Sequence, residues 1–325
     1  MRRLVALIFC SLLLSLNAFA QKNLSSEFKN MLEQKKDLTI SEVAALQQYD
    51  IYFIPGILAE SLIRGDDRSV LDLSIITRDY FGAQLDFLNN KYHIPARRLL
   101  TSSHRVEETQ NNIRNAVYQA NLSGRKVIFI SHSLGGLALL EELITNPAIQ
   151  DSVAGIAFLQ SPFYGTPLGD ILMDPPYQLE KIIKPLLPLV NISPETVEFV
   201  ASQSRLRFMR EHRQAVRSLI ARIPLFTFSG TAEANKSIFK PLIDIMAHGC
   251  VKGIKLGCIT EVFYPGPYDL SDGLIPLKSS KLENADYVYL KDVDHAEFIL
   301  NVPFRDFEKE HLTTSWLRVL LQKIH

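Results

Sequence analysis

The chain of 325 residues has little cysteine and no surplus of charge: three cysteines, and 35 Lys+Arg against 35 Asp+Glu. The zero formal charge and the lack of a basic block argue against a nucleic-acid binder, because such proteins neutralise phosphates with clustered Lys and Arg. Hydrophobic residues make up 47% of the chain, which excludes an intrinsically disordered protein. The length then fits one large α/β domain or two small domains.

Long apolar runs are also missing, and the one at the N-terminus is short. Arg2-Arg3 precede the apolar stretch Leu4–Leu14, and Ala18-Phe19-Ala20 has the small-residue pattern of a cleavage site. This order is typical of a secretory signal peptide, whereas an uncleaved anchor needs roughly 20 apolar residues. We therefore expect residues 1–20 to be removed on export, to the periplasm or out of the cell, which leaves residues 21–325 as a single domain.

Cleavage would also remove Cys10 and leave Cys250 and Cys258 as the cysteines of the exported chain. An isolated pair that closes a glycine-containing loop in an oxidising compartment favours a disulfide bond. Two free buried thiols are the alternative. Two sulfur ligands alone are too few for a zinc site.

Apolar runs and segments with helical spacing alternate along most of the chain. Strands are expected near 51–54, 98–101, 126–130, 154–159, 225–228 and 287–290, and helices near 24–47, 76–92, 106–121, 134–143 and 304–324. The run at 126–130 is continuously apolar, which favours a parallel strand buried on both faces. The sequence therefore predicts an α/β fold with a mostly parallel central sheet and helices on both faces.

A proline-rich and then arginine-rich stretch, about 168–222, interrupts this alternation and predicts a helical, cap-like insertion. Its apolar side chains could line an acyl pocket or form ordinary helix core: Leu172, Leu186, Leu187, Leu189 and Val190. The arginines from Arg205 to Arg217 could meet anionic lipid head groups, but a solvated charged face is favoured.

The stretch Ile128–Gly136 is the most informative, because an apolar strand runs through Ser131-His132-Ser133-Leu134-Gly135 into a helix. A nucleophile elbow has this context: a strained strand-to-helix turn that exposes a serine oxygen and needs small neighbours. Ser131 stands where glycine is usual, and the elbow's His132 is expected to point elsewhere. A helix N-cap role for Ser133 is the alternative.

A serine nucleophile needs a base, and His295 is the best candidate. It follows the apolar run 287–290 in a loop that can reach the carboxyl edge of the sheet. Asp272 precedes it, so that the order is Ser133, Asp272, His295, which is the Ser…Asp…His order of α/β-hydrolases. The competing acids are Asp269, Asp292 and Asp294.

With these motifs in place, the chain resembles an α/β-hydrolase of the lipase/esterase type from about residue 48 to 322. The resemblance rests on four segments in the family's order: the oxyanion loop 53–58, the elbow 131–136, the segment 160–167, and the acid and base loops at 271–273 and 294–295. Pro55 departs from the pattern, because histidine is frequent there.

The resemblance implies a role for each residue. Ser133 would attack an ester carbonyl, His295 would carry the proton, and Asp272 would hold the imidazole. The backbone N–H groups of Ile57 and Leu134 would bind the oxyanion. It implies no metal or cofactor, and a small-molecule or lipid ester as substrate, with transient contact to a lipid surface if the ester is a lipid.

Two other classes of function stay open. The same serine could serve an acyltransferase, a thioesterase or an amidase, because the elbow does not distinguish acyl acceptors. A non-catalytic binding protein on this fold is the second alternative, since a fold does not determine a function.

Overall fold

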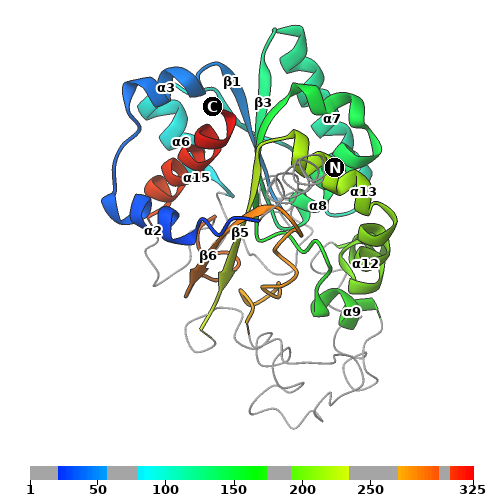
Figure 1. Ribbon diagram of the computed structural model, residues 1–325. Coiled ribbons are helices and arrows are strands. Elements are labelled where there is room, and N and C mark those ends of the chain that lie inside the picture. Colours follow the sequence, from blue (N-terminus) through cyan, green and yellow to red (C-terminus); the bar gives the residue numbers. More distant parts are fainter. Residues whose placement is uncertain (1–20, 57–79, 174–191, 234–269, 300–307) are drawn as a thin grey trace, which may run out of the picture.

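The computed structural model describes residues 21–56, 80–173, 192–233, 270–299 and 308–325 (Figure 1). These residues contain a six-stranded sheet in the order β2-β1-β3-β4-β5-β6, and every neighbouring pair is parallel. The strands are β1 (Tyr49–Ile54), β2 (Ala96–Arg98), β3 (Lys126–His132), β4 (Val153–Leu159), β5 (Leu225–Thr231) and β6 (Asp286–Lys291). The predicted α/β fold with a mostly parallel sheet is confirmed.

The central strands are buried on both faces, as their continuous apolar character requires. All of β4 and β5 is buried, and β3 is buried at every position after Lys126. His132 at the end of β3 is in register with Leu159 at the end of β4. The carboxyl ends of the two strands therefore meet at one edge, where residues that follow them come together.

Helices cover both faces of the sheet (Figure 1). One face carries α2 (Ser25–Gln34), α3 (Ile40–Leu46), α6 (Gly82–Asp86), the π-helix η1 (Phe87–Lys91) and α15 (Lys309–Ile324). The other carries α7 (Val106–Leu122), α8 (Leu134–Thr145), the 3-10 helix η2 (Pro147–Ser152) and α13 (Arg213–Arg222).

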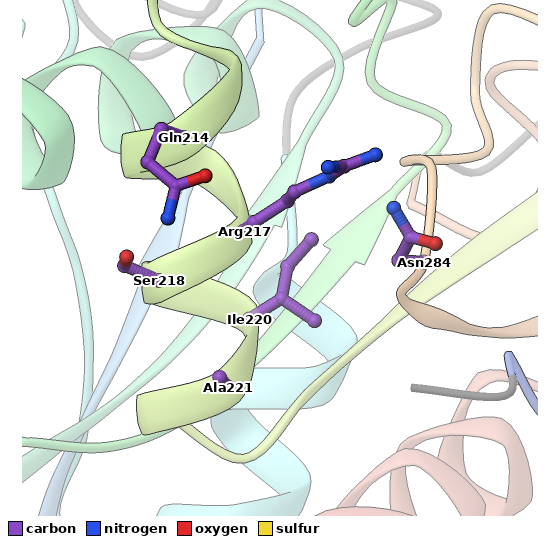
Figure 2. Close-up of a pocket in the computed structure, with 6 residues that line it drawn as sticks. All are labelled: Gln214, Arg217, Ser218, Ile220, Ala221 and Asn284. Atoms are coloured by element: carbon purple, nitrogen blue, oxygen red, sulfur yellow. The ribbon is translucent and has the colours of Figure 1, made fainter. Parts of the chain in front are cut away.

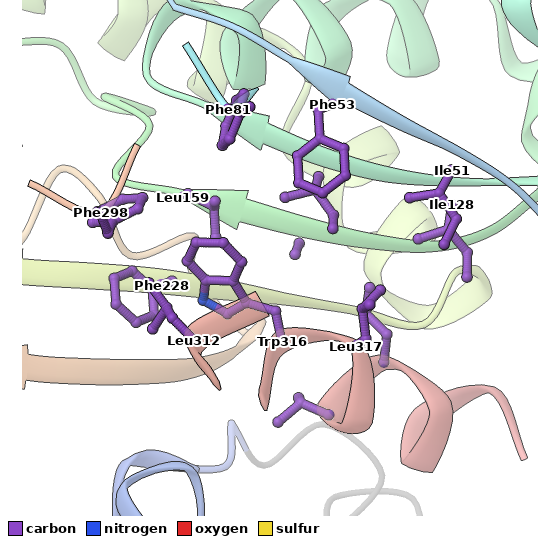
Figure 3. Close-up of a cluster of buried hydrophobic side chains, with 14 of the residues drawn as sticks. Ile51, Phe53, Phe81, Ile128, Leu159, Phe228, Phe298, Leu312, Trp316 and Leu317 are labelled. Atoms are coloured by element: carbon purple, nitrogen blue, oxygen red, sulfur yellow. The ribbon is translucent and has the colours of Figure 1, made fainter. Parts of the chain in front are cut away.

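An aromatic cluster ties α15 to the sheet and to the loop after β6 (Figure 3). The indole of Trp316 lies 5.7 Å from the ring of Phe228 and 5.5 Å from that of Phe298, measured between centroids. Phe228 belongs to β5, and Phe298 lies three positions after His295. Edge-on aromatic contacts stabilise beyond the area that they bury, so the His295 loop is anchored in the core.

Local structure differs from expectation in the N-terminal half. The helix expected over 24–47 is two helices, because Lys35 adopts a left-handed conformation (φ 46°) and Thr39 starts α3 with a capping box. Of the helix expected at 76–92, the described part is α6 followed by η1. The second strand lies at Ala96–Arg98, earlier than expected.

The stretch 168–222 is helical where it is described, with α9 (Pro167–Met173), α11 (Pro194–Val200), α12 (Ser202–Glu211) and then α13. The expectation of a solvated face is wrong for Arg205, which is 1% exposed. Its guanidinium donates to Glu141 of α8 at 2.6 Å and lies over the rings of Phe199 and Phe208. Arg205 therefore joins α12 to the body of the domain.

Several sequence predictions fall outside the described residues: the signal peptide 1–20, the pair Cys250 and Cys258, and Leu186, Leu187, Leu189 and Val190. Leu172, from the same group of apolar side chains, is half-buried in α9. Within the part of the chain that the structure describes, no helix combines the length and the apolar character needed to cross a bilayer.

Candidate active site

Ser133 occupies a strained turn between β3 and α8. Its φ of 53° and ψ of −126° lie outside the regions that residues with a Cβ prefer. Such positions cost about 1–3 kcal/mol each. Its backbone N–H donates to the carbonyl of Leu159 at 2.9 Å, and its side chain makes no cap hydrogen bond to α8. The geometry is that of a nucleophile elbow, and the alternative of an ordinary N-cap serine is not observed.

The turn is tight because neighbouring backbone and side-chain atoms crowd it. A Cβ on Gly135 would collide with the carbonyl oxygen of Pro55, and one on Gly136 would collide with the hydroxyl of Ser161. At position 56, an added Cβ would come within 2.8 Å of the Cβ of Ser133. These close approaches bring the end of β1 and the start of α8 together around the serine.

Ser133, His295 and Asp272 form one hydrogen-bonded chain. The Ser133 Oγ lies 2.9 Å from His295 Nε2, and the Asp272 Oδ2 lies 2.9 Å from His295 Nδ1. All three side chains are buried, with exposed fractions of 7%, 5% and 1% for the serine, histidine and aspartate. The structure thus brings together three residues that are 162 and 23 positions apart.

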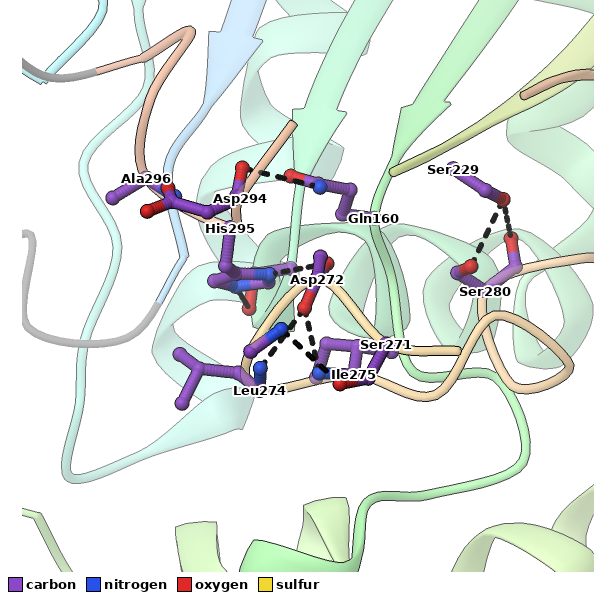
Figure 4. Close-up of polar contacts among 12 residues, drawn as sticks. Gln160, Ser229, Ser271, Asp272, Leu274, Ile275, Ser280, Asp294, His295 and Ala296 are labelled. Atoms are coloured by element: carbon purple, nitrogen blue, oxygen red, sulfur yellow. Dashed lines mark hydrogen bonds and ion pairs between the residues drawn. The ribbon is translucent and has the colours of Figure 1, made fainter. Parts of the chain in front are cut away.

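Backbone donors fix the orientation of Asp272 (Figure 4). Its Oδ1 accepts the N–H groups of Leu274 at 3.0 Å and Ile275 at 2.7 Å, which leaves Oδ2 for the imidazole. The N–H of His295 also donates to the carbonyl of Asp272 at 2.9 Å. The acid and base loops are therefore linked through main chain as well as side chains.

The competing acid Asp294 has a different task. Its Oδ1 accepts the N–H groups of Ala296 at 2.9 Å and Glu297 at 3.0 Å, so that it closes the turn around His295. Its carbonyl accepts a hydrogen bond from Gln160 Nε2 at 3.3 Å (Figure 4). Asp294 therefore shapes the base loop, while Asp272 contacts the imidazole. Asp269, another competing acid, lies outside the described residues.

Leu134, one of the two expected oxyanion donors, begins α8. The first N–H groups of a helix have no intrahelical acceptor and lie at the positive end of the helix dipole. Its backbone can therefore stabilise a negative oxygen next to Ser133. The second expected donor, Ile57, lies outside the described residues.

Two polar residues beside Ser133 were not predicted to belong to the site: His132, which was expected to point elsewhere, and Tyr80. The ring of His132 lies 4.5 Å from that of His295 between centroids, and its Nδ1 is 2.6 Å from the hydroxyl of Tyr80. Burial, with the neighbouring His295, lowers the pKa of His132 well below its usual value. The polar residue inside an apolar strand end was the available signal, since a buried histidine needs partners.

A hollow of about 440 Å³ lies elsewhere, on the outer side of α13 (Figure 2). Its lining is Gln214, Arg217, Ser218, Ile220, Ala221 and Asn284. Its described lining contains neither Ser133 nor His295, and no nucleophile with a base beside it. The hollow therefore does not compete with the serine as a site of chemistry.

The sequence matches no protein-family model, and comparison with curated proteins finds no match. Solved structures do match. A metagenomic carboxyl esterase, MGS0156, aligns with a TM-score of 0.56 and 18% identity over 85% of this chain and 75% of its own. The mature form of the Bacillus licheniformis lipase BlEst2 aligns with a TM-score of 0.51 and 16% identity over 76% of this chain and 84% of its own. With the six-stranded parallel sheet and its covering helices, these likenesses show that the chain has the α/β-hydrolase fold.

Proposed function

We propose that the protein is a serine hydrolase that cleaves carboxylic esters through an acyl-enzyme. The observation that carries the proposal is the chain of two 2.9 Å contacts from Ser133 through His295 to Asp272, at a strained turn. The names of the similar structures, a carboxyl esterase and a lipase, support the same chemistry.

In the proposed first step, the Ser133 oxygen attacks the ester carbonyl as His295 Nε2 takes its proton. The carbonyl oxygen becomes an oxyanion beside the N–H of Leu134, with Ile57 as the second expected donor; one such donor can be worth about 10²–10³ in rate. Asp272 stabilises the imidazolium and keeps its orientation. His295 then gives its proton to the leaving alkoxide, which departs as an alcohol.

Deacylation repeats these steps with water. His295 takes a proton from the water as it attacks the acyl-enzyme, and then returns that proton to Ser133 as the acid leaves. No cofactor is needed for either half-reaction. If another alcohol, thiol or amine took the place of water or of the leaving alcohol, the same residues would serve an acyltransferase, a thioesterase or an amidase.

Labelling with a fluorophosphonate probe tests the proposal directly. We expect stoichiometric labelling of the folded protein at Ser133, identified by mass spectrometry of the peptide, and turnover of p-nitrophenyl esters. Folded protein that is not labelled, alongside a control hydrolase that is, would favour the non-catalytic binding protein instead.

We further propose acyl or lipid esters as the substrate class, because the resemblance is to lipases and the insertion near 168–222 carries many apolar side chains. Turnover should then rise with the acyl length of p-nitrophenyl esters and increase above the solubility limit. A preference for acetate or butyrate without interfacial activation would contradict the lipid assignment.

Export and the disulfide bond Cys250–Cys258 are part of the same proposal, supported by the N-terminal pattern. N-terminal sequencing of protein secreted from an expression host should begin at Gln21. Thiol titration of that protein after denaturation should find no free thiol until a reductant is added.

A further inference from the structure

A buried tyrosine and a buried histidine beside Ser133 carry an inference that rests on the proposed function. Tyr80 is 3% exposed and His132 is 1% exposed. Neither takes part in the acyl-transfer steps described above. Burying two polar groups costs free energy unless they are hydrogen-bonded, so the question is which hydrogen bonds these two side chains make.

The direction of the hydrogen bonds follows from the donors that are present. The Tyr80 oxygen accepts the N–H of Gly56 at 2.8 Å, so its own proton is directed elsewhere. Burial raises the pKa of Tyr80 far above its usual value, which keeps the hydroxyl protonated. His132 Nδ1 lies 2.6 Å away and is the acceptor that this proton meets. With Nδ1 as the acceptor, the neutral His132 carries its proton on Nε2, which has no hydrogen-bond partner among the described residues.

The ring of His132 also contacts the ring of the base, His295. The His132 ring lies 4.5 Å from that of His295 and 5.5 Å from that of Phe298, between centroids. His295 is thus held between its polar partners and a flat, neutral ring. A charged ring there would oppose the imidazolium that His295 becomes when it takes the serine proton.

We propose that Tyr80 and His132 are a positioning pair that holds the end of β1 and the ring of His295 in fixed relation to Ser133. Tyr80 anchors Gly56, whose Cα approaches the serine so closely that an added Cβ would lie 2.8 Å from the Ser133 Cβ. The ring of His132, which Tyr80 holds in place, restricts the position of the His295 ring that it contacts. The pair contacts no substrate atom in the mechanism proposed above, so its effect is on geometry.

Tyr80→Phe removes one hydroxyl and keeps the ring, and His132→Phe keeps a ring against His295 while removing the acceptor. Tyr92→Phe is the matched control, because the hydroxyl of Tyr92 also accepts a backbone N–H, from Leu38 at 3.0 Å. Steady-state kinetics on p-nitrophenyl esters would be measured for the three single variants and for the double variant at positions 80 and 132, along with their melting temperatures.

We expect kcat to fall about tenfold in Tyr80→Phe and in His132→Phe, the size typical of one lost hydrogen bond, with KM unchanged. The double variant should lose no more than the worse single variant, because both changes break one coupled unit. Tyr92→Phe should lose stability of similar size and keep the wild-type kcat. A wild-type kcat in Tyr80→Phe, an equal kcat loss in the control, or multiplicative losses in the double variant would overturn the proposal.

The nitrogen NMR shifts of the His132 imidazole give a readout that needs no activity. We expect a neutral ring with Nδ1 unprotonated, and a shift of the Nδ1 signal when the Tyr80 hydroxyl is removed. Wild-type protein without esterase turnover would refute the proposed function by itself. The pair would then be judged on this shift alone, and an unmoved Nδ1 signal would overturn it.

Discussion

The two edges of the same sheet are built in opposite ways. At the amino edge, charged residues pair in partly exposed positions: Arg125 donates to Asp50 at 2.8 Å, and Lys323 to Asp286 at 2.5 Å. At the carboxyl edge, the polar residues are buried and linked by hydrogen bonds, and Ser133 is the central one. The amino edge is solvated and ionic, and the carboxyl edge is desolvated.

Left-handed backbone conformations occur at both edges of the sheet. Residues just after β3, β4 and β6 have positive φ without being glycine, namely Ser133 (53°), Gln160 (46°) and Asp292 (59°). At the amino edge, the positive φ before β3 falls on Gly124 (67°), where it costs little, whereas those before β2 and β6 fall on His93 (52°) and Asn284 (69°). At the carboxyl edge, one of these strained residues, Ser133, is the candidate nucleophile itself. The comparison teaches that substitutions at the carboxyl edge should reduce activity more than stability, and those at the amino edge the reverse.

Ser133→Ala should have the largest effect. Ester turnover should fall about 10⁴- to 10⁶-fold, because the nucleophile is lost, while the melting temperature changes little. Ser229→Ala is the matched control, since Ser229 is also buried, in β5, and its hydroxyl accepts that of Ser280 at 2.9 Å. Kinetics and thermal unfolding of both variants check this, and turnover retained in Ser133→Ala would exclude the serine as nucleophile.

Asp272→Asn should come next. The amide can no longer accept from the imidazole as a carboxylate does, and kcat should fall about 10⁴-fold with a small change in KM. Asp294→Asn keeps an oxygen for the N–H groups of Ala296 and Glu297, so its kcat should stay within about tenfold of wild type. The reverse ranking in steady-state kinetics would assign the acid to Asp294.

The third effect is a pH dependence of stability caused by His132. Its pKa is lowered on folding by burial and by the neighbouring His295, so the unfolded chain binds the proton more readily. Wild-type stability should therefore decline as pH falls through about 6.5, the ordinary histidine pKa. His132→Phe removes this group. Between pH 7.5 and 5, the melting temperature of the variant should therefore fall less than that of the wild type. If the melting temperatures of the two proteins changed in parallel with pH, the conclusion that His132 is neutral in the folded protein would be contradicted.

The smallest effect belongs to the amino edge. Arg125→Met removes hydrogen bonds to Asp50 and to the carbonyls of Gln47 and Tyr49. We expect a loss of about 1 kcal/mol in the free energy of unfolding and a kcat within twofold of wild type. Lys35→Met, at the exposed pair with Glu308, should change neither measurably. Denaturant unfolding and kinetics check both variants. A loss of activity in Arg125→Met would contradict the expectation that substitutions at the amino edge reduce stability more than activity.

The sequence was informative where one physical requirement dominates. A strand buried on both faces must be apolar throughout, so β3, β4 and β5 could be predicted to within a few residues. The serine turn could be predicted because its crowding demands small residues at fixed positions. The break between α2 and α3 was not predicted, because a left-handed Lys35 leaves no compositional mark. The capping box of Thr39 and Glu42 is the signal for it in the sequence.

By itself the sequence determined the α/β alternation, the parallel sheet and the candidates Ser133, Asp272 and His295, because burial and tight turns restrict which residues fit. Only the tertiary structure decided that Asp272 contacts the imidazole while Asp294 closes a turn. It also placed Tyr80 and His132 beside the base, and it buried Arg205 against Glu141. Such contacts join residues far apart in the chain, and their partners depend on how strands and loops meet in space, which local composition does not encode.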